Sequence, residues 1–308
     1  MSLRARSWHA SHTYAHADFP PARLAAERTV SVSVCLPARN EAATIGGILD
    51  SLLGLRAFGV IDQVVVVDDS TDGTGQIAHD LGAEVHEQVK LAPELGPVLG
   101  KGDAMWRSLP TLTGDVICFV DADTERFGAH FVCGLIGPLL CGPQEIEFVK
   151  GFYRRPFKLG GLTLPDGGGR VTELTARPLL NLFYPELAAV AQPLAGEIAA
   201  RRDLLERLPF VTGYGVDIAL LIDTYRTVGL DAIAQVDLAE RQNAHQSLRE
   251  LGPMAFSVLR ALASRLERED RLQGPLPTGF LMPGELDVGG GPEDVVERPP
   301  LVTLRTAA

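Results

Sequence analysis

Short, uninterrupted apolar runs that end at polar residues dominate the first half of the chain. Such runs cover residues 32 to 36, 64 to 67 and 116 to 120. Continuous apolar character, without alternation, is typical of strands buried on both faces of a parallel sheet. Residues 42 to 53 instead carry apolar side chains at helical spacing. This alternation of strands and helices predicts an α/β fold, a Rossmann-like and mainly parallel sheet with helices on both faces.

The remaining pattern predicts further elements and a division of the chain. Further strands are expected at residues 83 to 86, 148 to 153 and 232 to 238. Further helices are expected at residues 74 to 81, 129 to 141, 172 to 184 with a break or kink at Pro178, 198 to 205 and 216 to 228. We therefore expect four regions: an N-terminal arm (1–28) that packs on a neighbour, a first half (29–150), a mostly helical second half (151–272) and a flexible tail (273–308) whose first part is rich in Pro and Gly.

Composition narrows the classes of function. The chain has 308 residues, 46% of them hydrophobic, which is enough for a large core. Its net charge of −11 argues against nucleic acid as a partner, because phosphate backbones require clustered Lys and Arg. No apolar stretch is long enough to cross a membrane, and the four cysteines have no metal-ligand spacing. We expect a cytoplasmic protein without a membrane partner.

Two aspartates follow the third apolar run directly. Asp121 and Asp123 are separated by one alanine, so in extended backbone they point to the same side. Ligands of open α/β sheets bind at the carboxyl ends of the strands. Two adjacent carboxylates repel each other unless a cation intervenes, and their oxygens suit Mg²⁺ or Mn²⁺. The alternative is a pair of turn or capping aspartates.

Three other segments carry polar groups suited to a nucleotide. Residues 36 to 41 (LPARNE) and 68 to 74 (DDSTDGT) follow predicted strands, and Lys101 lies between two glycines. Glycines allow the backbone to approach a ligand closely, and an ammonium group can hold a phosphate. Each feature also has an ordinary explanation as a cap or a solvated lysine. Their coincidence at several strand ends favours a site for base, ribose and diphosphate.

A triple glycine precedes Arg170 in the second half. Residues 167 to 172 (GGGRVT) are a candidate anion site, because free amides at a helix start and a guanidinium both favour negative charge. A flexible surface loop is the alternative. A cluster of basic residues lies just before it in the sequence: Lys150, Arg154, Arg155 and Lys158.

These motifs resemble those of nucleotide-sugar-dependent glycosyltransferases with the GT-A fold. More narrowly, the chain is similar to the glucosyl-3-phosphoglycerate synthases of actinobacteria and their mannosyl counterparts, from about residue 7 to about residue 265. The narrower resemblance rests on residues 152 to 156 (FYRRP), 167 to 174 (GGGRVTEL), 176 to 180 (ARPLL), 192 to 194 (QPL), 196 to 197 (GE) and 213 to 216 (GYGV). It implies a retaining, metal-dependent hexosyltransferase of compatible-solute synthesis, and we expect a homodimer. The helical second half would bind the acceptor.

The resemblance also implies roles for individual residues. The nucleotide-sugar would be bound by Pro37, Ala38, Arg39, Glu41, Asp69, Ser70, Lys101, Asp121 and Ala122. The acceptor, 3-phosphoglycerate, would be held by Gly169, Arg170, Val171, Thr172 and Asn243. Candidate catalytic residues are Asp217, Glu197 and Lys101, and the metal ligands would be Asp123 and His245.

Two positions depart from the family's pattern. Asp217 stands where relatives are expected to have a glutamate, which is one methylene longer. A gapless comparison puts Asn243 where relatives have their metal-binding histidine, and His245 lies two residues further on. We assign the metal to His245, because imidazole binds such metals far better than an amide does.

The sequence leaves several alternatives open. The donor can be UDP- or GDP-glucose or GDP-mannose, because single hydrogen bonds around the base decide this choice. A sugar nucleotidyltransferase on a related fold would release pyrophosphate instead of a nucleoside diphosphate. A non-catalytic module would use the Asp68–Asp69 pair to bind metal or accept phosphate.

Overall fold

An eight-stranded sheet forms the centre of the molecule. The computed structural model describes residues 3–155, 157–159, 162–164, 169–241, 247–274 and 296–305. The strand order is β1-β11-β6-β9-β5-β2-β3-β4. The strands are β1 Thr13–Ala15, β2 Val32–Ala38, β3 Gln63–Asp68, β4 Glu84–Glu87, β5 Val116–Phe119, β6 Phe148–Arg154, β9 Ile198–Arg201 and β11 Ile233–Glu240. All neighbours are parallel except β9, which runs antiparallel to β5 and β6. The predicted mainly parallel sheet is confirmed.

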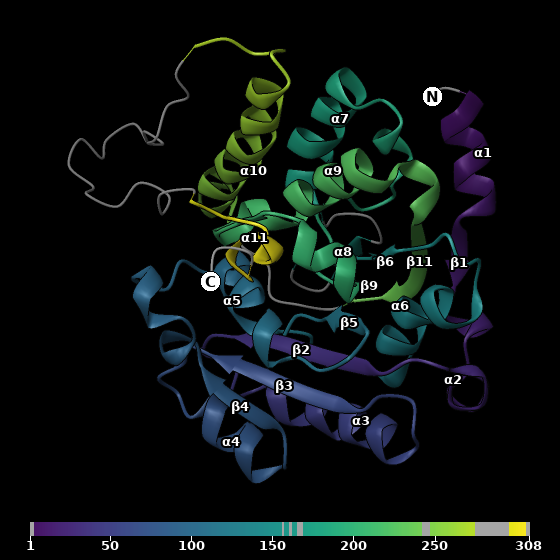
Figure 1. The fold of residues 1–308 in the computed structure, drawn as a ribbon, viewed down its shortest axis with the longest axis vertical. Helices are drawn as coiled ribbons and strands as arrows, with labels where there is room; N and C mark the ends of the chain where they lie inside the picture. Colours follow the sequence, from purple (N-terminus) through teal and green to yellow (C-terminus); the bar gives the residue numbers. More distant parts are fainter. Residues whose placement is uncertain are drawn as a thin grey trace.

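Helices cover both faces of this sheet. One face is covered by α1 Leu3–Ser11, α5 Lys101–Ser108, α7 Arg177–Phe183, α8 Arg202–Arg207, α9 Val216–Val228 and α10 Leu248–Arg268. The other face is covered by α2 Pro21–Glu27, α3 Ile45–Ala57, α4 Thr74–Asp80 and α6 Ala129–Cys141. Figure 1 shows α7, α9 and α10 on one side and α3 and α4 on the other. Among the described residues, no helix is long and apolar enough to cross a membrane.

Burial on both faces explains the uninterrupted apolar runs. In β2, Cys35 packs into the core on the α5 and α9 side, whereas its neighbours Val34 and Leu36 pack into the core on the α3 and α6 side. Consecutive side chains of a strand point to opposite faces. Because both faces are covered by helices, most positions of the central strands are apolar, and buried polar residues such as Ser33 are exceptions.

The helix predicted for residues 198 to 205 is wrong. Residues Ile198–Arg201 form β9, which lies between β5 and β6, and only Arg202–Arg207 form a helix, α8. The segment is a short apolar run, and such a run has no period that separates strand from helix. Here β5 and β6 each offer an edge with free backbone hydrogen-bonding groups. The segment forms a strand because β9 pairs with both of these edges.

The N-terminal arm packs on its own chain, and its packing on a neighbour stays a prediction. Strand β1 extends the sheet beside β11, with Tyr14 opposite Val236. The indole nitrogen of Trp8 donates a hydrogen bond of 2.8 Å to the carbonyl of Ile233. The arm therefore belongs to the same sheet as both halves of the chain.

The flexible tail predicted for residues 273 to 308 is wrong for its last part. Residues 296 to 305 contain β12 Glu297–Arg298, which pairs with β10 Phe210–Val211, and the short helix α11 Leu301–Arg305. Residues 275 to 295 lie outside the described part of the chain. Further elements are the hairpin β7 Phe157–Leu159 and β8 Leu162–Leu164, and a π-helical turn, Thr172–Ala176, that leads into α7.

Candidate active site

The turns that follow β2, β3 and β5 are bound to one another. The amide of Asn40 donates to Ser70 Oγ at 2.8 Å, and the amide of Thr71 donates to Asn40 Oδ1 at 2.9 Å. Thr44 Oγ1 donates to the carbonyl of Ala122 at 2.7 Å, which ties in the third turn. The polar segments predicted to share a site therefore lie together at the carboxyl edge of the sheet.

Most predicted nucleotide-binding residues lie in these turns. Pro37 and Ala38 end β2, and the exposed Arg39 Nε lies 3.7 Å from Asp69 Oδ2 on the neighbouring turn. Glu41 is bound through its backbone amide to Thr74 Oγ1 at 2.9 Å. Burial and the nearby Asp123 raise the pKa of the Glu41 carboxyl, so this side chain lies near the aspartate pair.

Arg241 joins the acidic residues of the site. It follows the last strand of the sheet, and its side chain is 2% exposed. Its Nη1 lies 2.9 Å from Asp121 Oδ2 and 2.6 Å from Glu197 Oε1, and its Nη2 pairs with Asp123. The same guanidinium thus contacts both aspartates of the predicted metal pair. Sequence reasoning missed this role, although a basic residue directly after a strand that ends at the same edge was an available signal.

Lys101 lies on the other side of Asp121. Its ammonium group donates to Asp121 Oδ1 and lies 4.0 Å from Asp217 Oδ2. Gly196 makes this arrangement possible, because a Cβ there would lie 2.1 Å from Lys101 Nζ and 2.6 Å from Asp121 Oδ1. A side chain at this position would therefore displace the end of Lys101 or of Asp121 from their contact.

The protonation states follow from burial and charge. Burial lowers the pKa of Lys101, but the carboxylates of Asp121 and Asp217 outweigh it and raise that pKa above its ordinary value. Burial also opposes ionisation of Asp121, yet Lys101 and Arg241 hold the pKa of its carboxyl well below the usual range. For Asp217, burial prevails over the attraction of Lys101 and raises its pKa. The site thus contains a firmly ionised Asp121 and, near it, the Asp217 carboxyl, which binds a proton more readily than an ordinary aspartate.

Glu197 is engaged within the protein. Its Oε2 accepts a hydrogen bond of 2.7 Å from the Tyr153 hydroxyl, and burial raises its pKa despite Arg241. Asp217 Oδ1, by contrast, is buried and has no hydrogen-bond partner among the described residues. Glu197 Oε1 also makes no hydrogen bond, but it lies 2.6 Å from Arg241 Nη1 in an ion pair, whereas no such ion pair is found for Asp217 Oδ1 among the described residues.

The donor chemistry at the aspartate pair fits a divalent cation. Asp121 and Asp123 offer carboxylate oxygens, the ligands that Mg²⁺ and Mn²⁺ prefer, and the guanidinium between them shows that the position attracts positive charge. In the described part of the chain, no three His, Cys, Asp or Glu side chains gather closely enough to hold a metal by themselves. His245 and Asn243, the alternatives for a further ligand, lie outside the described residues.

A small cavity is lined by two predicted acceptor-binding residues, Gly169 and Thr172. It has a volume of about 40 Å³, and its walls include Gly169, Thr172 and Arg155. Val171 instead packs against the hydrophobic core, so its side chain is structural. Arg170 begins the helical turn between Gly169 and Thr172. The cavity thus brings together Gly169 and Thr172 of the predicted acceptor set with Arg155 from the basic cluster.

Tyr153 connects this cavity with the acidic cluster. Its hydroxyl accepts a hydrogen bond of 2.6 Å from Arg155 Nη2 and one of 2.8 Å from Arg241 Nη1. The same hydroxyl donates to Glu197. An anion bound at Arg155 would therefore lie next to the charges that hold Asp121.

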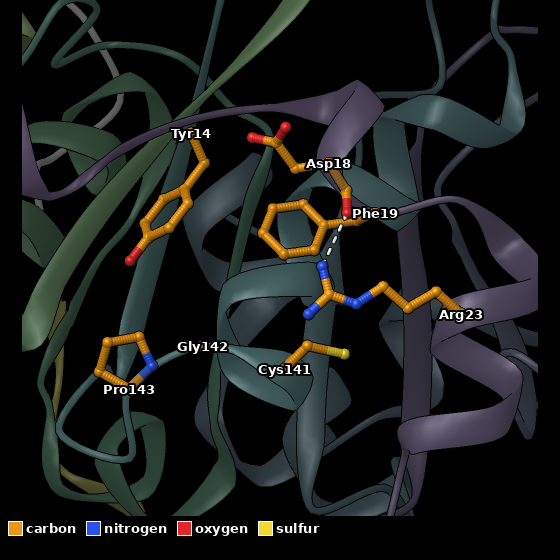
Figure 2. A pocket seen from close by; sticks show the side chains of 7 residues that line it. All are labelled: Tyr14, Asp18, Phe19, Arg23, Cys141, Gly142 and Pro143. Carbon is orange, nitrogen blue, oxygen red and sulfur yellow. Dashed lines mark hydrogen bonds between the residues drawn. The ribbon is translucent and has the colours of Figure 1, made fainter.

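A second, larger cavity lies away from these residues. It measures about 480 Å³ and is lined by Tyr14, Asp18, Phe19, Arg23, Cys141, Gly142 and Pro143. Figure 2 shows Arg23 reaching back to the carbonyl of Asp18, a hydrogen bond of 3.0 Å. None of the residues that the sequence predicts for the site lines this cavity.

Comparisons with known proteins identify the family of this chain. Residues 33–128 match the model of "Glycosyl transferase family 2". A glucosyl-3-phosphoglycerate synthase of Mycolicibacterium smegmatis is 43% identical over 97% of this chain and 98% of the relative. The corresponding synthase of Mycobacterium tuberculosis is 45% identical over 91% of this chain and 88% of the relative.

Solved structures extend the comparison to the fold. A crystal structure of mannosyl-3-phosphoglycerate synthase from Rubrobacter xylanophilus has a TM-score of 0.88 at 45% identity, covering 97% of this chain and 98% of that one. A Mycobacterium tuberculosis glucosyl-3-phosphoglycerate synthase, solved with Mn²⁺, UDP-glucose and phosphoglyceric acid, has a TM-score of 0.84 at 41% identity, covering 96% and 99%. The predicted GT-A fold is confirmed. From its near full-length similarity to these synthases, together with its fold and strand-end motifs, this chain belongs to the glucosyl-3-phosphoglycerate synthase family.

Proposed function

We propose that the protein transfers glucose from a nucleoside-diphosphate glucose to the 2-hydroxyl of 3-phosphoglycerate. The observation that carries this proposal is the pairing of Lys101 and Arg241 with Asp121 at the carboxyl edge of the sheet. A leaving diphosphate needs positive charge, and these two cations, the buried Arg241 and the partly buried Lys101, are positioned before the reaction begins. The relatives that share this fold include a structure solved with UDP-glucose and phosphoglyceric acid.

We further propose a divalent cation, Mg²⁺ or Mn²⁺, held by Asp123 with His245, while Asp121 borders the ribose or sugar. A cation bound there supplies Lewis-acid neutralisation of the departing diphosphate. Lys101 shares that charge from the opposite side of Asp121. Because Arg241 contacts both aspartates, it holds their carboxylates at one place.

The acceptor would bind at the small cavity lined by Gly169, Thr172 and Arg155. Arg170 and Arg155 would hold its phosphate and carboxylate, since guanidinium groups bind such anions with two parallel hydrogen bonds. The 2-hydroxyl then attacks the anomeric carbon, and the configuration is retained. Asp217, with its free buried oxygen, would contact the sugar, whereas Glu197 would hold Tyr153 and Arg241 in place.

A mannose donor is the second candidate. It is favoured by the mannosyl-3-phosphoglycerate synthase of Rubrobacter xylanophilus, which matches this chain with a TM-score of 0.88. GDP-mannose would use the same aspartates and cations, so the two activities differ only in the contacts around the base and the sugar.

We also propose a cytoplasmic homodimer whose product serves as a compatible solute or its precursor. All four cysteines are free thiols, which fits a reducing compartment. Leu174 and Leu182, in the helical segment beside the acceptor cavity, are 73% and 71% exposed and offer apolar surface for a second copy. Light scattering on the purified protein measures the oligomeric state directly.

An activity matrix tests the proposed function. UDP- and GDP-linked glucose and mannose are each incubated with 3-phosphoglycerate in the presence of Mg²⁺, Mn²⁺ or a chelator. We expect the fastest turnover with a glucose donor, no turnover without the acceptor, and loss of activity with the chelator. Fastest turnover with GDP-mannose would support the second candidate, and absence of turnover with all four donors would contradict both.

A further inference from the structure

We propose that Arg298, close to the end of the chain, is a positioning residue for nucleotide binding. It acts through Lys101, from which it is separated by almost 200 positions in the sequence. This inference rests on the proposed function, because it gives Arg298 the role of holding Lys101 in place, and Lys101 is the cation proposed to face the diphosphate. Four features of the described residues support it.

The first feature is a buried carboxylate in the first turn of α5. Asp103 is fully buried and lies two residues after Lys101. Arg298 donates to both of its oxygens, from Nε at 2.7 Å and from Nη2 at 3.1 Å. Arg107, one turn further along α5, lies 3.0 Å from the same carboxylate. A buried charge without its partners is costly, so Arg298 is needed wherever Asp103 remains buried.

The second feature is the loop before α5, which both arginines hold. Arg107 donates to the carbonyls of Leu91 and Ala92 at 2.6 and 2.9 Å. Arg298 Nη1 donates to the carbonyl of Leu95 at 3.3 Å, and the amide of Leu99 donates to Asp103 at 3.0 Å. The Arg298–Asp103 pair thus fixes the backbone on both sides of Lys101.

The third feature is the close contact of α5 with β10. A Cβ at Gly102 would lie 1.9 Å from the carbonyl of Val211, so the helix rests directly on that strand. The last segment of the chain pairs with the same strand, with Arg298 opposite Phe210. Lys101 therefore begins a helix that is held between β10 and the C-terminal segment.

The fourth feature is that the C-terminal segment has separate anchors. Trp106 donates to the carbonyl of Pro299 at 2.8 Å, and Arg305 pairs with Glu206 of α8 at 2.8 Å. Figure 1 shows the segment and α11 lying beside α5 and α8. Because Arg305 contacts α8 and not α5, it provides a matched control for loss of an arginine from the same segment.

Nucleotide affinity measured by calorimetry tests the inference. The titrant is UDP, or GDP if the activity matrix favours it, with Mg²⁺, and the variants are Arg298→Ala, Arg305→Ala, Lys101→Ala and the Arg298→Ala/Lys101→Ala double variant. We expect Arg298→Ala to weaken nucleotide binding at least fivefold, with an unchanged Michaelis constant for 3-phosphoglycerate. Arg305→Ala is expected to bind as the wild type does. In the Lys101→Ala background, Arg298→Ala should cause no further loss, because coupled residues are not additive.

Additive losses in the double variant, or equal losses in Arg298→Ala and Arg305→Ala, would overturn the inference and leave only a structural role. If Arg298→Ala does not fold, Arg298→Lys replaces it throughout. Lysine keeps the charge but cannot make both hydrogen bonds to Asp103, so an intermediate loss of affinity is expected, and wild-type affinity would overturn the inference. A wild-type protein that binds neither nucleotide would contradict the proposed function and the role of Arg298 together, whereas wild-type binding with additive losses contradicts Arg298 alone.

Discussion

The ammonium group of Lys150 donates a hydrogen bond of 2.7 Å to the backbone carbonyl of Ala195. Lys150 lies in β6 and is 1% exposed. Ala195 lines the acceptor cavity and precedes the glycine that allows Lys101 to approach Asp121. One buried cation thus connects the sheet to the backbone between the two predicted substrate sites.

This relationship predicts a pH dependence of stability. Burial lowers the pKa of Lys150 to about 8 and repulsion by Lys101 adds to this effect, while the carboxylates of Asp217, Glu197 and Asp121 oppose it. In the unfolded chain the lysine keeps its ordinary, higher pKa. Between these two values the unfolded state binds more protons, so the cost of burying Lys150 is fully present below about pH 8 and declines as the pH rises.

The measurement compares wild type with Lys150→Met, both without metal or nucleotide, by chemical denaturation. From about pH 7 to about pH 10 the free energy of unfolding should shift in favour of the wild type, relative to the variant, by on the order of 2 kcal/mol. The other groups that titrate in this range are present in both proteins, so the comparison with the variant isolates the contribution of Lys150. A difference that does not change with pH would mean that Lys150 has an ordinary pKa.

Asp123→Ala should abolish transfer while the fold persists. Asp123 is half exposed, and its carboxylate contacts Arg241 rather than the hydrophobic core, so its loss removes a metal ligand without creating a cavity. Mn²⁺ binding, followed by electron paramagnetic resonance, should weaken in parallel with activity. Asp80→Ala, at an exposed position on α4, is the control. Near-normal activity with unchanged metal dependence would rule out the metal assignment.

Arg170→Ala should raise the Michaelis constant for 3-phosphoglycerate much more than that for the sugar donor. A charge-assisted bidentate contact with an anion contributes on the order of 2–4 kcal/mol. Initial rates measured while each substrate is varied in turn separate the two constants. Arg207→Ala, an exposed arginine on α8, should leave both unchanged. If the constant for the donor rises instead, the acceptor site has been misplaced.

His245→Ala should raise the metal concentration needed for half-maximal activity, whereas Asn243→Ala should not. Neutral imidazole is a good ligand for manganese and an amide is a poor one. Metal is titrated at saturating acceptor, and acceptor is titrated at saturating metal. An effect of His245→Ala on the acceptor titration alone would move His245 to the phosphoglycerate site and show that the metal assignment is wrong.

Elements with a strong period were predictable from the sequence. The helices at residues 129 to 141 and 216 to 228 begin and end where their patterns predict. The helix predicted from residue 42 begins instead at Ile45, because residues 41 to 44 bind the neighbouring turns through Glu41 and Thr44. Such contacts between segments far apart in the sequence leave no periodic signal.

The same limit applies to the site. Asp121, Asp123 and Lys101 were predictable because they stand beside apolar runs or glycines. Arg241 and Lys150 were not assigned roles, since their functions depend on which strands lie next to each other. The insertion of β9 between β5 and β6 brings Glu197 to Arg241, and this insertion is the feature that the sequence pattern mispredicts.

Product analysis of a single reaction tests the transfer itself. The wild type is incubated with 3-phosphoglycerate, Mg²⁺ and the glucose donor that turns over fastest, and the products are identified by mass spectrometry and by proton and phosphorus magnetic resonance. The predicted result is one equivalent of nucleoside diphosphate for each glucose that becomes α-linked to carbon 2 of 3-phosphoglycerate. Release of pyrophosphate, or glucose linked to the acceptor at another position or in the β configuration, would contradict the proposed reaction.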